Sequence, residues 1–99
     1  MNNLYIYKSN IHGLGLFSMK YYKPHDIILY NCIDNNTQDI SELASYVNHS
    51  YNPNSILYYD SNINGYHLIA LKNINISDEI TGNYNYTPSY IKKPDKSWY

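Results

Sequence analysis

The stretch of this chain most suggestive of chemistry is Asn48-His49-Ser50, which is followed by a turn at Pro53-Asn54. An imidazole between an amide and a hydroxyl can transfer protons, bind a metal, or brace a loop through hydrogen bonds to the backbone. Taken alone, these residue types leave all three uses open.

A second candidate is Gly13-Leu14-Gly15, because paired glycines let the backbone adopt positive φ and approach a ligand closely. A phosphate-binding loop of the G-x-G-x-x-G type requires a third glycine and a helix after it. Ser18 stands at the third position, and an extended apolar segment follows. Without further context, a tight turn between two strands is the simpler interpretation.

Other routes to metal or nucleophilic chemistry have little support in the sequence. The four histidines lack the helical spacing typical of metal ligands, and we expect no metal site. Cys32 is the only cysteine, which excludes an internal disulfide and a cysteine-cluster zinc site. Nothing places Cys32 beside a base or at the start of a helix, so a Cys–His hydrolase is not indicated.

Length and composition restrict the function further. A chain of 99 residues is one domain with a small core. A net charge of −1 with 7 basic residues argues against phosphate-driven nucleic acid binding, although some of the 14 tyrosines could stack on single-stranded bases. No apolar run approaches the roughly 20 residues of a membrane span. With no secretory signal visible, we expect an intracellular protein, cytoplasmic or nuclear, that does not contact a membrane.

Short strands should position these residues. Alternation predicts a strand over residues 4–8, and the apolar run 27–30 predicts a buried one. Residues 56–59 and 67–71 should form a hairpin whose turn ends in Asn64-Gly65. The apolar spacing within residues 40–47, after a capping-like Asp39, predicts a helix of two turns. The expected domain is therefore mostly β with one short helix.

Three motifs, in order, resemble those of the SET-domain protein lysine methyltransferases. They are Gly13-Leu14-Gly15-Leu16-Phe17, then Asn48-His49-Ser50-x-x-Pro53-Asn54, then Glu79-Ile80-Thr81-x-x-Tyr84, and the Ala70-x-Lys72-x-Ile74 segment also fits. The resemblance covers about residues 4–86 and leaves an aromatic and basic tail over 87–99, within a single domain of 1–99. It implies a SET-domain, β-clip-like fold of small curved sheets with a C-terminal pseudoknot.

The resemblance also implies a cofactor and a reaction. The cofactor would be S-adenosylmethionine (SAM), and its methyl group would pass to a lysine side chain of a protein or peptide, with a histone tail as a possible substrate. By the family pattern, Gly13-Leu14-Gly15 would lie against the methionine part of SAM. The Asn48 side chain and the His49 backbone would hold the cofactor, and Tyr84 would be the catalytic residue beside the methyl group.

The chain departs from the family in its middle and at its end. Only residues 33–47 connect the early strands to the triplet, so one wall of the usual substrate groove is short. Tyr86, Tyr90, Trp98 or Tyr99 could rebuild the lysine channel, and Tyr86 is the best placed of these. Gly82 would leave room in the channel for more than one methyl group. We expect no zinc-binding segment of the kind that follows some SET domains, which agrees with the expectation that there is no metal site.

Two further expectations follow from the short insert. A homodimer could complete the half-built C-terminal site. The alternative to an enzyme is a catalytically impaired SET-like module, which binds SAM or a protein partner without methylating it.

Overall fold

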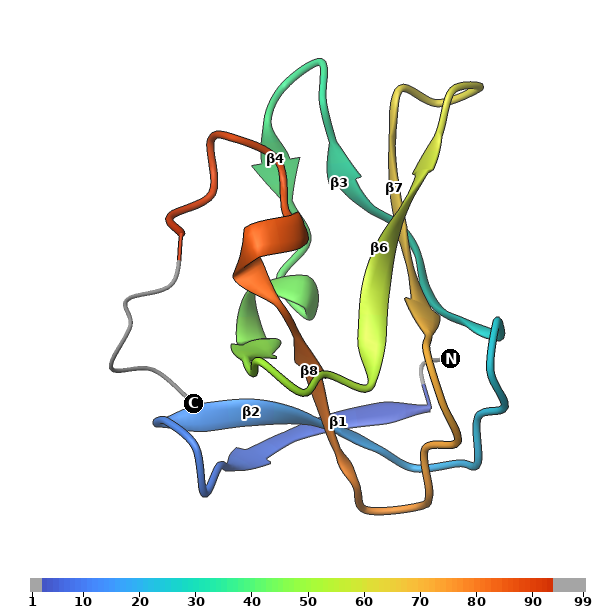
Figure 1. Cartoon of the computed structure of the whole chain (residues 1–99), viewed down its shortest axis with the longest axis vertical. Helices are drawn as coiled ribbons and strands as arrows, with labels where there is room; N and C mark the ends of the chain where they lie inside the picture. Colours follow the sequence, from blue (N-terminus) through green and yellow to red (C-terminus); the bar gives the residue numbers. More distant parts are fainter. Residues whose placement is uncertain (1–2, 94–99) are drawn as a thin grey trace.

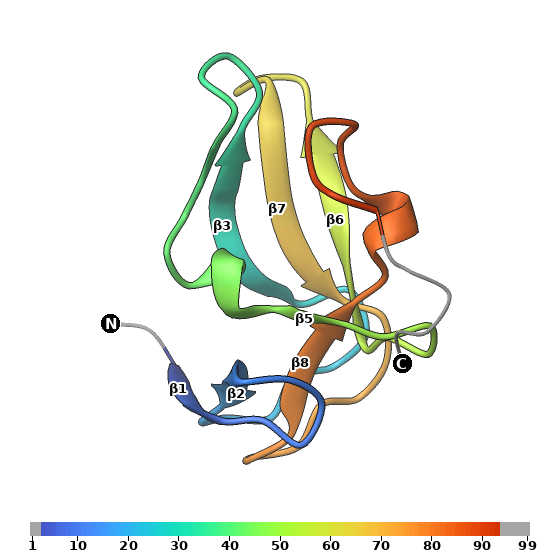
Figure 2. The same cartoon turned by 90° about the vertical axis from the view of Figure 1, so that its left-hand side faces the viewer.

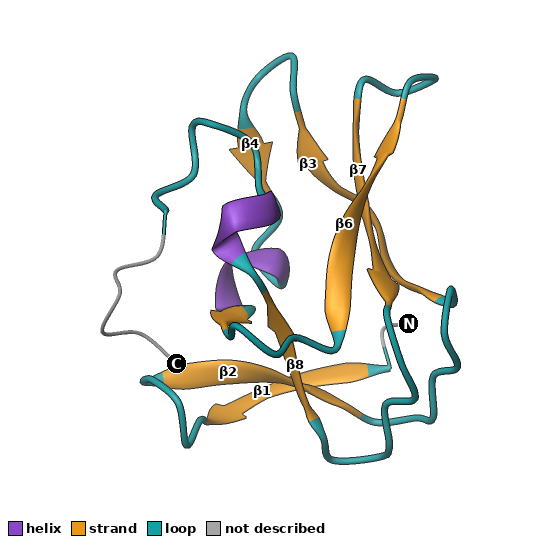
Figure 3. Cartoon of the chain, viewed as in Figure 1, coloured by secondary structure: helices purple, strands orange, loops and turns teal. Residues whose placement is uncertain are grey.

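The computed structural model describes residues 3–93, and its regular structure consists almost entirely of short strands joined by loops and turns (Figure 3). Its regular elements, in chain order, are β1 (Leu4–Lys8), β2 (Leu14–Ser18), β3 (Ile27–Asp34), β4 (Asp39–Ile40), the 3₁₀ turn η1 (Ala44–Tyr46), β5 (Asn48–His49), β6 (Ser55–Asp60), β7 (Gly65–Ala70), β8 (Glu79–Gly82) and the 3₁₀ turn η2 (Tyr84–Tyr86). No α-helix occurs within the described residues. The predicted mostly-β class is confirmed.

The strands form two four-stranded sheets, with strand orders β1-β2-β8-β5 and β4-β3-β7-β6. In Figure 1, β1 and β2 run across the bottom of the molecule, whereas β3, β7 and β6 rise above them. Figure 2 shows β8 and β5 in the region between these two groups of strands. Residues that pack between the sheets are therefore drawn from both halves of the chain.

The strands predicted from alternation and from turn residues are present. Residues 4–8 form β1, which pairs antiparallel with β2. β6 and β7 form the predicted hairpin, in register from Ser55↔Ala70 to Asp60↔Gly65. Asn64 at its turn adopts a φ of 46°, a left-handed conformation that asparagine tolerates better than most residues. The strand predicted over 27–30 continues to Asp34.

β8 is inserted between two strands that are distant from it in sequence. It pairs antiparallel with β2 and in parallel with β5, where Asn48 lies opposite Thr81 and His49 opposite Gly82. The buried Ser55 hydroxyl donates to the Thr81 carbonyl at 2.6 Å. The C-terminal strand is thus held on both edges, which is the arrangement that the expected SET fold and its pseudoknot require.

Asn54 secures β8 from a third direction. Its side chain donates to the Glu79 carbonyl at 2.8 Å and accepts the Thr81 N–H at 2.9 Å, as a neighbouring strand would. One amide side chain thereby satisfies two backbone groups that would otherwise lack partners. The Pro53-Asn54 turn therefore has a structural use that is independent of chemistry.

The core lies between the sheets and is small. Leu16, Ile74 and Ile80 have no exposed surface, and Cys32 is almost fully buried. Burying a side chain of this kind stabilises the fold by about 1.5–3 kcal/mol. Leu16 belongs to β2 and Ile80 to β8. The core therefore stabilises the strands that contain the Gly13-Leu14-Gly15 motif (the glycine loop) and the motif that begins at Glu79 (the C-terminal motif).

The helix predicted within residues 40–47 is wrong. Asp39–Ile40 forms β4, which pairs with the end of β3, and the helical part is the single 3₁₀ turn Ala44–Tyr46. The backbone N–H of Ser41 donates to the Cys32 carbonyl, which holds the residue after β4 beside β3. Of residues 41–47, which remain before β5, only Ala44–Tyr46 is helical.

Within residues 3–93, no helix has the length and apolar character needed to cross a membrane.

Candidate functional site

The side chain of Asn48 joins the glycine loop to the C-terminal motif through hydrogen bonds. Its amide nitrogen lies 3.0 Å from the His12 carbonyl oxygen, 3.1 Å from that of Leu14, and 2.9 Å from Oε2 of Glu79. All three partners can only accept hydrogen bonds, so the amide end that faces them must be the NH₂ group. The Asn48 carbonyl oxygen is therefore directed away from the loop as an acceptor.

The two glycines of the loop serve different purposes. Gly13 has a φ of +48°, and a side chain added there would meet no heavy atom within 4 Å. A Cβ on Gly15, in contrast, would lie 2.4 Å from Oε2 of Glu79. Gly13 thus provides a left-handed turn beside open space, whereas Gly15 is required by the close approach of Glu79. This use of Glu79 was not predicted from the sequence.

His49 follows Asn48 in β5 and contacts a different part of the chain, as expected because successive strand residues point to opposite faces. Its Nδ1 accepts the backbone N–H of Tyr84 at 3.0 Å, and the two rings lie edge to face at 5.3 Å. A nitrogen that accepts an N–H carries no proton, so the ring is neutral with its proton on Nε2. Burial lowers the pKa of His49, which favours the same state.

Tyr84 is fixed at both its backbone and its hydroxyl. The hydroxyl donates to the Val47 carbonyl at 2.6 Å, and burial raises the pKa of the phenol. The group therefore stays protonated at neutral pH, with its single proton directed to Val47. Toward any further group, the Tyr84 oxygen can act only as an acceptor.

An apolar cavity of about 210 Å³ adjoins Tyr84. The residues that line it come from two segments, 33–68 and 82–91. They are Ile33, Ile40, Ala44, Ser45, Val47, Ile56, Leu57, Leu68, Gly82, Asn83, Tyr84, Tyr86, Thr87 and Ile91. Of the residues predicted to line a substrate channel, Gly82 and Tyr86 are among them, and Tyr86 is largely exposed. Tyr90 is not among them, and Trp98 and Tyr99 lie outside the described residues.

The C-terminal segment closes one side of this cavity. Tyr90 donates its hydroxyl to Oδ1 of Asn35, which ties the segment to the turn between β3 and β4. Ile91 contributes to the cavity wall, and Lys93 donates to the carbonyl oxygen of Thr87 at 2.7 Å. Residues that follow the third motif therefore supply part of the cavity wall.

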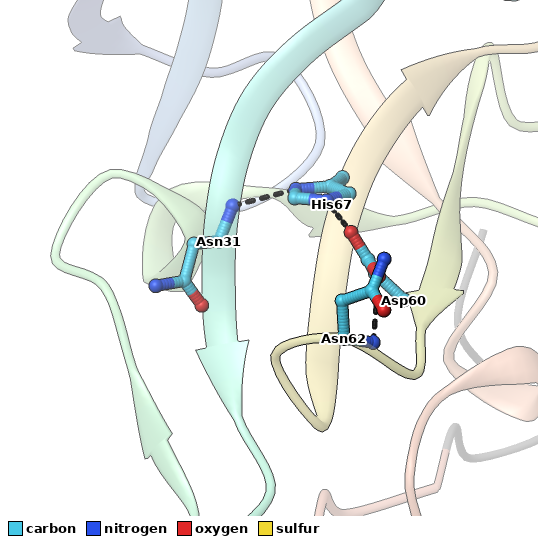
Figure 4. Close-up of polar contacts among 4 residues, drawn as sticks. All are labelled: Asn31, Asp60, Asn62 and His67. Carbon is cyan, nitrogen blue, oxygen red and sulfur yellow. Dashed lines mark hydrogen bonds and ion pairs between the residues drawn. The ribbon is translucent and has the colours of Figure 1, made fainter.

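A His–Asp pair elsewhere in the molecule has the composition of an acid–base site but not its geometry (Figure 4). Nε2 of His67 lies 2.9 Å from Oδ2 of Asp60, and Nδ1 accepts the backbone N–H of Asn31 at 2.8 Å. The hydrogen bond from His67, together with that from Asn62, lowers the pKa of Asp60. Both ring nitrogens of His67 are therefore used to join β3, β7 and β6, and neither is available for proton transfer.

The remaining reactive groups do not form a second centre. Burial raises the pKa of the Cys32 thiol to about 11, so it is a protonated core residue at neutral pH. In the part of the chain that the structure describes, no three His, Cys, Asp or Glu side chains come together as a possible metal site.

The structure thus brings the predicted residues together in two linked places. Asn48 and Gly13–Gly15 meet at the loop, with Glu79 behind them. His49 and Tyr84 meet on the other side of β5, beside the cavity that contains Gly82 and Tyr86. Glu79 belongs to the third motif, but no local sequence feature indicates that it packs against Gly15.

Comparisons with known proteins agree with this geometry. Residues 29–85, more than half of the chain, match the sequence profile of the SET domain. No curated protein sequence matches the chain. A crystal structure of a candidate histone methyltransferase from Plasmodium falciparum has a similar fold, with a TM-score of 0.64 and 23% identity, covering 88% of this chain and 96% of that one. SET domains are generally protein lysine methyltransferases. This chain belongs to the SET-domain family.

Proposed function

We propose that this protein transfers a methyl group from SAM to a lysine side chain of a protein. The observation that carries the proposal is the pair of adjacent residues Asn48 and His49. Asn48 is bonded to the glycine loop, and His49 is bonded to Tyr84 beside an apolar cavity. One short strand therefore connects a candidate cofactor surface to a candidate lysine channel.

The chemistry of the loop suits SAM, which carries a cationic sulfur and an ammonium group. Asn48 directs an acceptor oxygen away from the loop, and Gly13 leaves open space at its Cα. We assign cofactor binding to Gly13, Leu14, Gly15, the Asn48 side chain and the His49 backbone, with Tyr84 alongside. SAM, when bound, supplies a methyl group whose transfer breaks a C–S bond, forms a C–N bond and leaves a neutral thioether.

The cavity suits the other reactant. A lysine must be a neutral amine to attack, and an apolar surrounding disfavours its ammonium form. The walls are mostly aliphatic and aromatic side chains. The Tyr84 hydroxyl oxygen can accept a hydrogen bond from the amine N–H, which orients the nitrogen lone pair toward the methyl group. Alignment at about 3–3.5 Å then provides most of the rate enhancement, without a tuned acid or base.

Charge is distributed in a way that favours a basic substrate. Residues 24–71 contain five carboxylates and no lysine or arginine, and all seven lysines of the chain lie outside this range. The same residues form the β4-β3-β7-β6 sheet and most of the cavity wall. The total charge is nearly neutral, but residues 24–71 are acidic. Attraction between opposite charges increases the rate at which a basic substrate meets this region. We propose a lysine within a basic segment, such as a histone tail, as the substrate.

One observation favours a second function. The connection from β3 to β5 contains a two-residue strand and one 3₁₀ turn, so it offers little surface for gripping a substrate. A SET-like module that binds SAM or a protein partner without methylating it is consistent with this. A homodimer, in which a second copy supplies the missing wall, would instead preserve activity, and sedimentation would detect it.

The test combines binding and labelling. Calorimetry should show SAM binding to the purified protein, and a lysate incubated with the protein and methyl-labelled SAM should contain labelled protein lysines. If SAM binds but no protein is labelled, the enzyme proposal is wrong and the binding module stands. If SAM does not bind, the enzyme proposal and the SAM-binding form of the module are both wrong.

A further inference from the structure

The carboxylate of Glu79 lies behind the candidate cofactor surface and receives hydrogen bonds from neutral groups. The Ser9 hydroxyl lies 2.7 and 2.8 Å from its two oxygens, and the Asn48 amide nitrogen lies 2.9 Å from Oε2. Among the described residues, no cationic side chain pairs with Glu79, whereas Asp60 pairs with His67. The charge of Glu79 is thus partly removed from water without a cationic partner from the described chain.

Such an arrangement has a cost. A carboxylate that is half-buried loses hydration, and neutral donors replace only part of it. A hydrophobic or amide side chain of similar size would avoid this cost. A cation that binds nearby would offset it, and the ligand that this surface is proposed to bind is cationic.

The same carboxylate also sets the polarity of its neighbours. Because Glu79 accepts from the Asn48 amide nitrogen, the Asn48 oxygen is turned toward the ligand side. Because Ser9 directs its proton to Glu79, the Ser9 oxygen accepts from the backbone of Ile11 at 2.9 Å, which shapes the loop before Gly13. Charge and orientation therefore act together to present acceptors, not donors, to the ligand.

We propose that Glu79 is a positioning residue which makes this surface selective for the cationic methyl donor over its neutral thioether product. This inference rests on the proposed function, since it concerns the same cofactor. Transfer of the methyl group removes the positive charge at sulfur, so the thioether product would bind more weakly than SAM. The selectivity would therefore help SAM to replace the product after each reaction. Glu79 itself does not take part in the reaction.

The experiment compares two ligands by calorimetry, SAM and S-adenosylhomocysteine, in the wild type and in Glu79→Gln. Glutamine keeps the size and one acceptor but removes the charge. We expect Glu79→Gln to weaken SAM about tenfold and to weaken the thioether about twofold, so that the preference for SAM shrinks. Glu42→Gln, at an exposed carboxylate outside the site, should leave both affinities unchanged.

Ser9→Ala distinguishes charge from shape. It removes one hydrogen bond and keeps the Glu79 charge, so both ligands should weaken by a similar factor and the preference should remain. If Glu79→Gln weakens both ligands equally, Glu79 has only a structural role and the inference is wrong.

A comparison in the wild type covers the case in which Glu79→Gln does not fold. An analogue with an ammonium group in place of the sulfonium should then bind as SAM does, and more tightly than the thioether. Equal binding of the ammonium analogue and the thioether would overturn the inference while leaving the proposed function intact. Failure of the wild type to bind SAM would overturn the proposed function and, with it, this inference.

Discussion

The backbone N–H of Tyr84 donates to Nδ1 of His49 across 3.0 Å, which joins the end of the C-terminal motif to the Asn-His-Ser triplet. The hydrogen bond requires a neutral imidazole, and burial of the ring lowers its pKa. In this site, His49 is a fixed acceptor for Tyr84 and has no need to exchange protons. Residue type alone left proton transfer, metal binding and loop bracing equally open.

Replacing His49 with phenylalanine should therefore affect folding more than proton chemistry. His49→Phe keeps an aromatic ring against Tyr84 and Tyr51 but leaves the Tyr84 N–H without its acceptor. Loss of one partner from a buried hydrogen bond costs about 1–3 kcal/mol. Urea denaturation should show a decrease of this size in the free energy of unfolding. No change in stability would contradict the assigned hydrogen bond.

The same variant should alter the pH dependence of stability. The pKa of His49 is lowered in the folded protein, whereas the unfolded chain binds a proton near the ordinary value of about 6.5. The unfolded state therefore binds more protons below that pH, and stability should fall as the pH decreases from about 6.5. Above about pH 7 this contribution should be constant. The difference between wild type and His49→Phe, measured from pH 5 to 8, isolates it from the other histidines.

Asn48 offers a test of hydrogen-bond polarity. In Asn48→Asp an oxygen replaces the NH₂ group that faces two carbonyls and the Glu79 carboxylate. An acceptor placed against three acceptors should destabilise the fold more than simple removal of the group. We expect Asn48→Asp to be less stable than Asn48→Ala by about 1 kcal/mol or more at neutral pH, and both to weaken SAM binding. Equal stability of the two variants would mean that the amide is oriented differently.

The contact between Gly15 and Glu79 can be measured by a double-mutant cycle. Gly15→Ala places a Cβ 2.4 Å from Oε2 of Glu79 and should destabilise the fold by about 1–3 kcal/mol. In a Glu79→Ala background the same change should cost less, although Ser9 lies 3.1 Å away and also limits the space. We expect a coupling energy on the order of 1 kcal/mol by thermal or urea unfolding. Additive effects would show that the two residues are not in contact.

Much of this arrangement could be predicted from the sequence, and the reasons are local. The alternation over residues 4–8 and the turn at Asn64-Gly65 determine β1 and the β6–β7 hairpin within a few residues. The three motifs indicated the SET fold in advance, and the profile match confirms the family.

The errors and omissions come from contacts between distant residues. The segment predicted as a helix starts at the end of β4 instead, because Ile40 pairs with Ile33, a partner that apolar spacing does not reveal. Likewise, the use of Glu79 depends on Ser9, seventy residues away. His67 and Asp60 are close in sequence, but only the bulged pairing of β3 with β7 brings the Asn31 N–H to the ring.

Gly82 should determine how many methyl groups the product carries. A Cβ at this position would lie 3.5 Å from Cγ1 of Val47, an ordinary contact, and Gly82 lines the cavity. The wild type should therefore proceed beyond monomethyllysine, and Gly82→Ala should do so with unchanged stability. Gly82→Phe would occupy part of the cavity and should stop at the monomethyl product. Mass spectrometry at exhaustive turnover measures this, and a purely monomethyl product from the wild type would contradict it.

If the Asn48–His49 strand joins a SAM-binding surface to a lysine channel at Tyr84, the methyl-transfer rate of Tyr84→Phe should reveal it. The variant loses the hydroxyl that donates to Val47 but keeps the ring. The measurement is single-turnover labelling of a lysine peptide or lysate protein, with SAM affinity measured on the same samples. We predict that Tyr84→Phe binds SAM within about threefold of wild type and transfers methyl groups at least about tenfold more slowly. Equal labelling by the two proteins would show that methyl transfer does not need the Tyr84 hydroxyl, and the proposed lysine channel at Tyr84 would be wrong.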